Sequence, residues 1–360
     1  MLPPAPVRRL LLVPLVVVIG VALAALTPPV ALLSAAYNLV RRDRPGPVRR
    51  SRLLRVIILG LVWSMGETAA LTVFLGLWLA SGFGGRLETE PYQSRHYAVL
   101  AWFLDLVYRT AVRVGGLTVT VSGQPEPVPP GDRPLIVLSR HAGPGDSLLL
   151  IRYLLSECQR RPRVVMKATL QLDPTTDIAA NRLPNAFLRR AAHGAAAASQ
   201  RTEQVRRLAA GMAGGSALVV FPEGGNWTPY RWQRAIDRLR RGGRPDLAER
   251  AAAMPNVLPP HGGGALAAIA ACPGADVIFV AHTGLDELVS VRDVWRRLHS
   301  EMTVIARWWR VPAARVPAPS DREAQLTWLY DWWQRIDEWI TANRPPATDP
   351  ARPARPASPG

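Results

Sequence analysis

The sequence predicts an α/β protein in which helices cover a mainly parallel central sheet, preceded by hydrophobic membrane helices at the N-terminus. Two observations carry this prediction. Apolar runs of strand length, such as Leu135–Leu138 and Val277–Ala281, alternate with stretches of helical spacing, which is typical of parallel sheets. Two nearly uncharged apolar stretches near the N-terminus each exceed the roughly 20 residues that cross a bilayer.

The first apolar stretch, Leu10–Val40, is interrupted by Pro28 and Pro29. It predicts either one long kinked helix or a hairpin that enters and leaves a single leaflet, because proline disturbs a helix interior. The second stretch, Val56–Ala80, contains Glu67 as its only charged residue. Both are therefore candidates for insertion into a membrane.

Seven arginines lie within residues 41–55, between and at the start of these stretches. Such a run is expected to stay in the cytoplasm. A second stretch that then crossed the bilayer would place the rest of the chain outside. A re-entrant second stretch, or an exception to the charge rule, would return it to the cytoplasm, and the sequence leaves these alternatives open.

The remaining elements follow from periodicity. Tyr97–Val112 has the apolar spacing of an amphipathic helix, and Leu117–Val121 alternates like a half-buried strand. Further strands are expected at Val164–Met166, Ala217–Phe221, Val277–Ala281 and Met302–Ala306, and a helix at Arg201–Met212. An apolar stripe in the C-terminal helix predicts packing on the core rather than contact with lipid; it consists of Leu326, Tyr330, Trp333, Ile336 and Ile340.

Composition bounds the partners. The 360 residues carry 44 basic and 27 acidic side chains, a formal charge of +17, which favours an anionic partner such as a membrane, a nucleic acid or a phosphorylated substrate. No nucleic-acid recognition motif is present, so we expect no nucleic acid to bind. Cys158 and Cys272 make no disulfide framework, which favours a reducing compartment.

One stretch combines a strand, a sharp turn and a helix. Leu135–Leu138 reads as a buried strand, His141 follows its end, and a Gly-Pro-Gly turn leads to Asp146. Because ligands collect at the carboxyl ends of parallel strands, this is where chemistry is expected. A carboxylate bound to one imidazole nitrogen leaves the other free to accept a proton. A turn histidine with a capping aspartate is the alternative, and His282 with Glu287 is a comparable pair.

Three other segments contain candidate binding residues. Phe221-Pro222-Glu223-Gly224-Gly225 follows a strand, where an acidic residue and backbone amides could meet a polar ligand; an ordinary turn is the alternative. Lys167 is the only lysine, and Arg189 with Arg190 could bind phosphate or form a solvated pair. The arginines of Arg231–Arg250 favour a solvated helix face, with lipid headgroups as second choice.

Taken in order, these segments resemble the glycerolipid acyltransferases, the 1-acylglycerol-3-phosphate acyltransferases and their lysophospholipid relatives. The blocks are Ser139–Asp146, Lys167, Phe187–Arg190, Phe221–Gly224 and Val257–Pro260. The resemblance covers Gly115–Ala281 and continues more loosely through Trp308–Val311 and Trp328–Trp333. These last segments look like the C-terminal extension of the eukaryotic-type and lysocardiolipin-type branch.

The resemblance implies a fold like that of glycerol-3-phosphate acyltransferase and a transfer of acyl groups other than amino-acyl groups. His141 would be the general base and Asp146 its orienting carboxylate, whereas His282 would be structural. Backbone amides in the Ala142–Asp146 turn would stabilise the oxyanion. The implied substrate-binding residues are Lys167, Arg189, Arg190, Phe221, Pro222, Glu223, Gly224 and Gly225.

The implied donor is an acyl-CoA or acyl carrier protein thioester, which acts as co-substrate, and no bound cofactor or metal is expected. The implied acceptor is a lysophospholipid, lysophosphatidic acid first, and anionic membrane lipids are expected partners. We expect residues 1–82 to anchor the chain, residues 83–344 to form the acyltransferase domain with its helical extension, and residues 345–360 to be a disordered tail. The expected location is a bacterial inner or plasma membrane, with the catalytic domain on its cytoplasmic side.

Four positions depart from the family pattern. Gly225 and Asn226 stand where the family usually has Thr followed by Arg, Arg189 replaces an acidic residue, and His261 follows Pro260 where this branch often has Arg. These are acceptor-side positions, so the acceptor stays open between lysophosphatidic acid, another lysophospholipid such as lysocardiolipin, and a glycolipid. A non-catalytic basic scaffold that binds membrane lipid is the alternative from another class.

Overall fold

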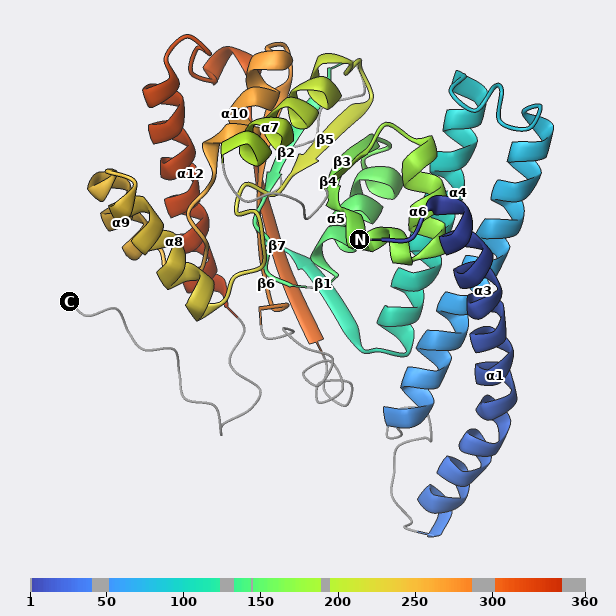
Figure 1. Ribbon diagram of the computed structural model, residues 1–360. Coiled ribbons are helices and arrows are strands. Elements are labelled where there is room, and N and C mark those ends of the chain that lie inside the picture. Colours follow the sequence, from blue (N-terminus) through green and yellow to red (C-terminus); the bar gives the residue numbers. More distant parts are fainter. Residues whose placement is uncertain are drawn as a thin grey trace. The chain divides into compact units, whose positions relative to one another are not determined.

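In the computed structural model, the strand that precedes His141 lies between two parallel neighbours (Figure 1). This strand, β2 (Leu135–Ser139), pairs in parallel with β5 (Ser216–Val220) and with β6 (Asp276–Thr283). Every residue of the three strands is buried. Their unbroken apolar sequences reflect this, because a strand covered on both faces has no polar side to expose.

The structure describes residues 2–40, 52–123, 133–143, 145–188, 195–286 and 302–344. They fall into two units. The first unit contains described residues within 1–118, 148–190 and 290–302, and the second contains those within 119–147, 191–289 and 303–360. His141, Asp146 and the Phe221–Gly225 segment all belong to the second unit, whereas Lys167 belongs to the first.

The sheet of the second unit has the strand order β1-β7-β6-β2-β5. Its edge strand β1 (Leu117–Val121) begins in the first unit, and β7 (Met302–Val311) pairs antiparallel with β6. The expected strand at Met302–Ala306 is therefore correct but five residues too short at its end. The α/β class and the mainly parallel sheet are confirmed.

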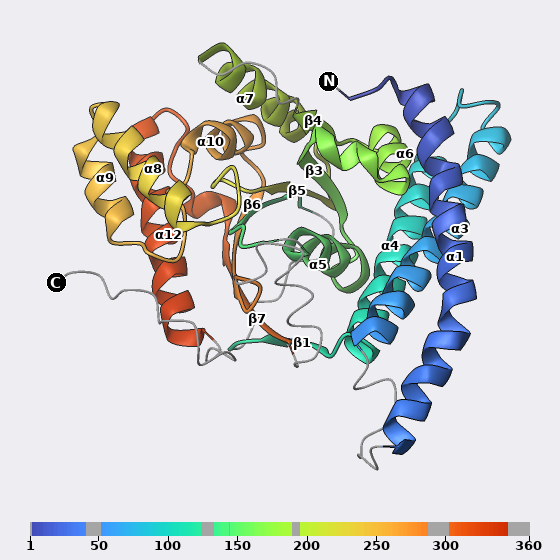
Figure 2. The same cartoon turned by 60° about the horizontal axis from the view of Figure 1, so that its bottom comes forward.

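Helices surround this sheet in the second unit (Figure 2). They are α7 (Ala195–Ala210), α8 (Pro229–Arg241), α9 (Pro245–Ala252), α10 (Gly262–Ala271) and α12 (Arg322–Asn343), with a 3-10 turn η3 (Ala313–Arg315). Helix α12 packs on β6, where the rings of Phe279 and Trp332 stack with centroids 4.6 Å apart. Trp333 and Ile336 are fully buried, so the predicted packing of the C-terminal helix is confirmed.

The first unit consists mainly of helices. These are α1 (Ala5–Val40), α3 (Arg52–Ala80), α4 (Glu90–Arg113) and α6 (Pro174–Arg182), with a π-helical turn η1 (Tyr153–Glu157) and a 3-10 turn η2 (Ala168–Leu172). Strand β3 (Arg161–Lys167) pairs in parallel with β4 (Ala186–Leu188). Helix α5 (Asp146–Arg152) begins at the candidate aspartate.

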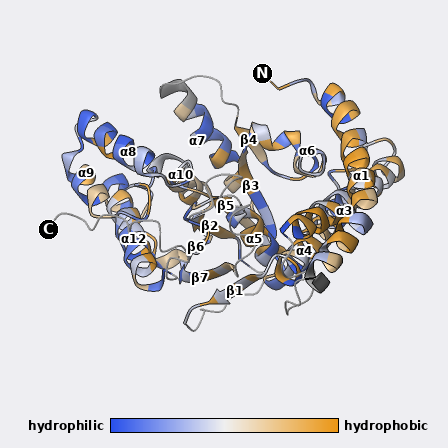
Figure 3. Ribbon diagram, turned by 90° about the horizontal axis from the view of Figure 1, so that it is seen from below, coloured by the Kyte–Doolittle hydropathy of each residue, from blue (hydrophilic) through white to orange (hydrophobic). Residues whose placement is uncertain are grey.

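Helices α1 and α3 are long and apolar enough to cross a membrane, and Figure 3 shows their hydrophobic residues. Helix α1 continues through Pro28 and Pro29, so the hairpin alternative for the first apolar stretch is wrong. The two helices differ in exposure: 6% of the apolar window of α1 is buried, against 33% for α3. The structure says nothing of the arginine run at 41–51 or the tail at 345–360, which lie outside the described residues.

Polar contacts hold both apolar helices to α6. Arg8 and Arg9, at the start of α1, donate to the carboxylate of Asp177 at 2.5 and 2.8 Å. From α3, Glu67 accepts a hydrogen bond from the backbone N–H of Thr175, and the carbonyl of Phe74 accepts one from Arg182. Arg8, Glu67 and Asp177 are all buried. Isolated buried charges are costly, so these pairings fix α1 and α3 on α6.

We expect Trp333→Ala to lower the free energy of unfolding by about 3–5 kcal/mol, because it leaves a cavity among the aromatic side chains between α12 and β6. The neighbouring Gln334 is exposed, and Gln334→Ala should change stability by less than about 0.5 kcal/mol. Denaturant unfolding of the detergent-solubilised protein measures both. Equal stability of the two variants would contradict this account of α12.

Candidate active site

The candidate histidine and aspartate meet in the turn between β2 and α5. The Nδ1 atom of His141 lies 2.9 and 3.1 Å from the two carboxylate oxygens of Asp146. Gly145 has φ of 101°, a left-handed conformation that disfavours residues with a Cβ, and it brings the chain back toward the ring. The Asp146 side chain is 2% exposed and that of His141 17%, so a substrate can still reach the imidazole.

Asp146 is held as an anion. Besides His141, the backbone N–H groups of Ala142, Gly143 and Ser147 donate to its carboxylate at 2.8, 3.3 and 2.5 Å. Burial acts to raise the pKa of Asp146, but the hydrogen bond from His141 and the charge of His282 outweigh it and lower the pKa. Because the ionised carboxylate only accepts, Nδ1 must carry the hydrogen, which leaves Nε2 as a proton acceptor.

The expectation for the oxyanion donors is narrowed by the hydrogen bonds of the turn. Within the Ala142–Asp146 turn, the amides of Ala142 and Gly143 both donate to the Asp146 carboxylate. An amide that is bound to a carboxylate cannot also stabilise a negative charge on the substrate. These two amides hold Asp146, so the predicted oxyanion donors are restricted to the other amides of the turn.

The Phe221–Gly225 segment follows β5 and surrounds His141. The ring of Phe221 lies 4.7 Å from the imidazole, centroid to centroid. Glu223 accepts hydrogen bonds from the backbone N–H groups of His141 and Leu258 at 3.3 and 3.2 Å, one on each carboxylate oxygen. The N–H of Trp227 donates to the His141 carbonyl at 3.2 Å. Three residues of one loop thus fix the ring and the backbone of His141.

Glu223 is 3% exposed and its two oxygens are occupied by these amides. Of the two roles expected for it, binding glycerol hydroxyls or shaping the pocket, this geometry favours the second. Burial raises the pKa of Glu223 to about 8, against the opposing effects of Arg140 and the two amide hydrogen bonds. Pro222 is buried as well, and its carbonyl accepts the N–H of His261 at 2.9 Å.

His282 approaches the same aspartate from β6. Its Nε2 lies 3.0 Å from the carbonyl of Arg140 and 3.7 Å from a carboxylate oxygen of Asp146. Burial lowers the pKa of His282, against the opposing effect of the Asp146 carboxylate. The comparable pair with Glu287 cannot be assessed, because Glu287 lies outside the described residues.

Arg140 is a site residue that the sequence reasoning missed. Its guanidinium is fully buried and donates to the carbonyls of His282 and Asn256 at 2.6 and 2.9 Å and to the carboxylate of Asp286. Burial opposes the ionisation of Asp286, but the charge of Arg140 lowers its pKa. The only signal was the position of Arg140 beside His141, since its partners lie more than 100 residues away.

Three predicted substrate-binding residues remain, namely Lys167, Arg189 and Arg190. Lys167 ends β3 in the first unit with an exposed side chain, and Arg189 and Arg190 lie outside the described residues. Their roles stay predictions. Within the described part of the chain, no cluster of three His, Cys, Asp or Glu side chains could hold a metal.

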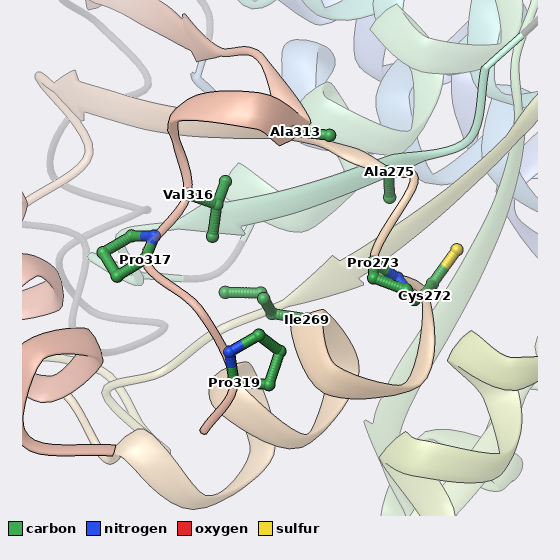
Figure 4. Close-up of a pocket in the computed structure, with 8 residues that line it drawn as sticks. All are labelled: Ile269, Cys272, Pro273, Ala275, Ala313, Val316, Pro317 and Pro319. Atoms are coloured by element: carbon green, nitrogen blue, oxygen red, sulfur yellow. The ribbon is translucent and has the colours of Figure 1, made fainter. Parts of the chain in front are cut away.

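A pocket of about 220 Å³ lies elsewhere in the second unit, beside the end of α10 (Figure 4). Its lining includes Ile269, Cys272, Ala275, Val316 and Pro317. It shares no residue with the histidine site and presents no charged side chain. Reactive side chains therefore gather at His141 and not in this pocket.

Residues 118–281 match the model of a protein family described as Acyltransferase. This segment is less than half of the chain and contains His141, Asp146 and Phe221–Gly225. No curated protein matches the sequence. Among solved structures, the chain is similar to the 1-acyl-sn-glycerophosphate (LPA) acyltransferase PlsC from Thermotoga maritima, at 17% identity and a TM-score of 0.49, covering 81% of this chain and 99% of that one.

We expect stability to depend on the protonation of Glu223. Its pKa rises from 4.5 in the unfolded chain to about 8 in the folded one, so the folded state binds the extra proton. The contribution to stability is complete below pH 4.5 and is lost as the pH rises through 8. Denaturant midpoints between pH 5 and 9 should fall in the wild type and fall less in Glu223→Gln.

The matched control is Glu249→Gln on α9, whose side chain is exposed. It should reproduce the wild-type pH profile. The glutamine at 223 turns an amide group toward a backbone N–H, which lowers stability by a constant amount at every pH. An unchanged pH slope in Glu223→Gln would contradict the assignment.

Proposed function

We propose that the chain is a membrane-associated acyltransferase that moves a fatty acyl group from acyl-CoA or acyl carrier protein to the free hydroxyl of lysophosphatidic acid, giving phosphatidic acid. One observation carries the proposal. A buried ionised carboxylate fixes Nδ1–H of an accessible histidine, at the end of a central strand and within the segment that matches the Acyltransferase family model. This is the arrangement of a general base, not of a capping residue alone.

The reaction needs only one group that accepts and returns a proton. The acceptor hydroxyl gives its proton to Nε2 of His141 as its oxygen bonds to the thioester carbonyl carbon. When the tetrahedral intermediate collapses, the carbon–sulfur bond breaks and the leaving thiolate takes that proton. Asp146 stabilises the imidazolium between the two steps, and general base catalysis of this kind contributes about 10²–10⁴ in rate.

The aspartate and histidine variants test the proposal. With lysophosphatidate and radiolabelled acyl-CoA in purified membranes, His141→Ala and Asp146→Asn should each lose at least about two orders of magnitude in kcat. Ser147→Ala keeps the backbone N–H that binds Asp146 and should retain activity. Wild-type turnover in His141→Ala or Asp146→Asn would refute the mechanism.

The acceptor alternatives give distinct results in the same assay. Transfer to lysocardiolipin, another lysophospholipid or a glycolipid, but not to lysophosphatidate, would keep the reaction and change the acceptor. A protein that transfers to none of them, yet binds anionic vesicles in a salt-dependent way that ignores His141, would be the basic scaffold.

We also propose that the apolar helices α1 and α3 insert into the cytoplasmic leaflet and do not cross the membrane. The ion pairs of Arg8 and Arg9 with Asp177 require residues 8 and 177 to lie on the same side of the membrane. The chain between them therefore crosses twice or not at all. If the chain crossed twice, the arginine run at 41–55 and the rest of the chain would lie on opposite sides of the membrane. An arginine run outside the cytoplasm is opposed by its positive charge. An arginine run inside the cytoplasm would leave the rest of the chain outside.

The burial of α3 supports the same choice. Glu67, Ala70 and Phe74 are almost fully buried against other parts of the first unit, including α4 and α6. Protein covers 33% of the apolar window of α3, so this part of the helix is not available to lipid. Acyl-CoA and acyl carrier protein are cytoplasmic donors, which requires the histidine site to face them.

Cysteine labelling tests this topology. In a chain with Cys158 and Cys272 replaced by serine, Gly46→Cys and Glu249→Cys should both react with an impermeant maleimide in inside-out vesicles and neither in intact spheroplasts. Glu249 reports the second unit and Gly46 the arginine run. Labelling of the two positions from opposite sides would show that the helices cross the membrane.

A further inference from the structure

The two glycines of the Phe221–Gly225 loop face an imidazole ring and a guanidinium group. A Cβ atom at Gly224 would lie 3.3 Å from the imidazole carbon Cδ2 of His261, and one at Gly225 would lie 3.1 Å from a guanidinium nitrogen of Arg231. His261 and Gly225 are both positions at which the chain departs from the acyltransferase pattern. The structure therefore brings these departures together on one loop.

Arg231 reaches this loop from the first turn of α8. Its backbone N–H donates to the Thr228 hydroxyl at 3.2 Å, which caps the helix and fixes the turn. One guanidinium nitrogen donates to the carbonyl of Asn226 at 3.1 Å. Within the described chain, the guanidinium has no carboxylate partner, and the side chain is exposed. Its other N–H groups are available to a ligand.

More positive charge stands behind it. Arg238 on α8 and Arg201 on α7 are near enough for their charges to act on the His261 imidazole. The acidic residues of these helices are already paired: Asp237 with Arg240 at 3.8 Å, and Glu203 with Arg206 and Arg207 at 2.6 and 2.8 Å. Among the described residues, no carboxylate forms an ion pair with Arg201, Arg231 or Arg238, and such a cluster attracts an anion.

The same loop contacts the catalytic base. Phe221 lies on the His141 ring, Glu223 binds its backbone N–H, and Trp227 binds its carbonyl. Gly224 and Gly225 lie between these contacts. In lysophosphatidate, two carbons and one oxygen connect the free hydroxyl oxygen to phosphorus. A hydroxyl bound at His141 would thus carry its phosphate toward the next residues of the loop.

We propose that Arg231 and His261, with Arg238 and Arg201 behind them, form the site that binds the phosphate headgroup of the acceptor. This rests on the proposed acyl transfer and narrows its preferred acceptor to an anionic phosphate ester rather than an uncharged glycolipid. Arg231 contributes the bidentate contact, because its planar guanidinium matches phosphate oxygens. The cation that the family usually has in the loop is supplied here from a helix, and the glycines make room for it.

The test compares two acceptors with the purified full-length protein. Arg231→Gln should raise KM for lysophosphatidate by about tenfold or more, since a hydrogen bond to a charged group is worth about 1.5–3 kcal/mol, with little change in kcat. KM for acyl-CoA and the turnover of the uncharged monoacylglycerol of the same chain length should not change. Arg231→Lys should fall between wild type and Arg231→Gln.

Arg234→Gln is the matched control. Arg234 lies on the same helix with its guanidinium over the ring of Tyr230, 5.7 Å from the centroid, and its loss should leave both acceptors unaffected. An equal effect of Arg231→Gln on charged and uncharged acceptors would mean a structural role. No effect on lysophosphatidate, or a raised KM for acyl-CoA, would equally overturn the assignment.

Binding without turnover separates this site from the proposed reaction. His141→Ala should gain thermal stability with sn-glycerol 3-phosphate and less with inorganic phosphate, and His141→Ala/Arg231→Gln should gain with neither. If these stability changes are observed but the wild type transfers no acyl group, the headgroup site is retained and the proposed reaction is refuted. Acyl transfer by the wild type with an unchanged KM in Arg231→Gln would retain the reaction and refute the site.

Discussion

The carboxylate of Asp146 is the group on which the geometry of the histidine site depends. It accepts from the imidazole and from three backbone amides, so it fixes the ring and the turn at once. A carboxylate removed from water costs several kcal/mol unless such partners replace the solvent. Any movement of the turn would therefore leave the buried carboxylate without hydrogen-bond donors. His141 is held in the same rigid arrangement, because its Nδ1 binds this carboxylate.

The surroundings keep the charges in balance. Arg140 sits directly before His141 and its fully buried guanidinium is neutralised by Asp286, while burial raises the pKa of Glu223 to about 8 and lowers that of His282. Asn256 extends this network to the C-terminal helix: its carbonyl accepts from Arg140 and its N–H donates to Asp337 of α12 at 2.6 Å. Asp337 and Asn256 thus link helix α12 to Arg140, the residue before His141. This link accounts for a buried aspartate in an otherwise aromatic interface.

Much of this could be predicted from local sequence, and the remainder could not for a physical reason. Buried parallel strands appear in the sequence as apolar runs, and such runs predicted β2, β5 and β6. The order of strand, glycine turn and helix predicted that His141 lies near Asp146. Partners distant in sequence leave no such pattern: nothing local distinguishes Arg140 from a surface arginine, because Asn256 and Asp286 are its partners only in the fold. Residue types also do not predict individual hydrogen bonds. The sequence could not show that the amides of Ala142 and Gly143 bind Asp146, or that backbone amides occupy both oxygens of Glu223. Helix α1 was ambiguous because its prolines weaken a helix without forbidding one.

The glycine loop links composition to specificity. A threonine at 225 would place its Cβ 3.1 Å from the guanidinium of Arg231, which would have to shift by a few tenths of an ångström. Gly225 and Arg231 therefore depend on each other, because the absence of a side chain at Gly225 leaves space for the guanidinium from helix α8. The same logic joins Gly224 to His261, whose ring occupies the space that a Cβ would crowd. The capped first turn of α8 and the Asn226 carbonyl position Arg231, whereas Phe221, Glu223 and Trp227 hold His141. One loop thus contacts both the histidine and the arginine, but through different residues.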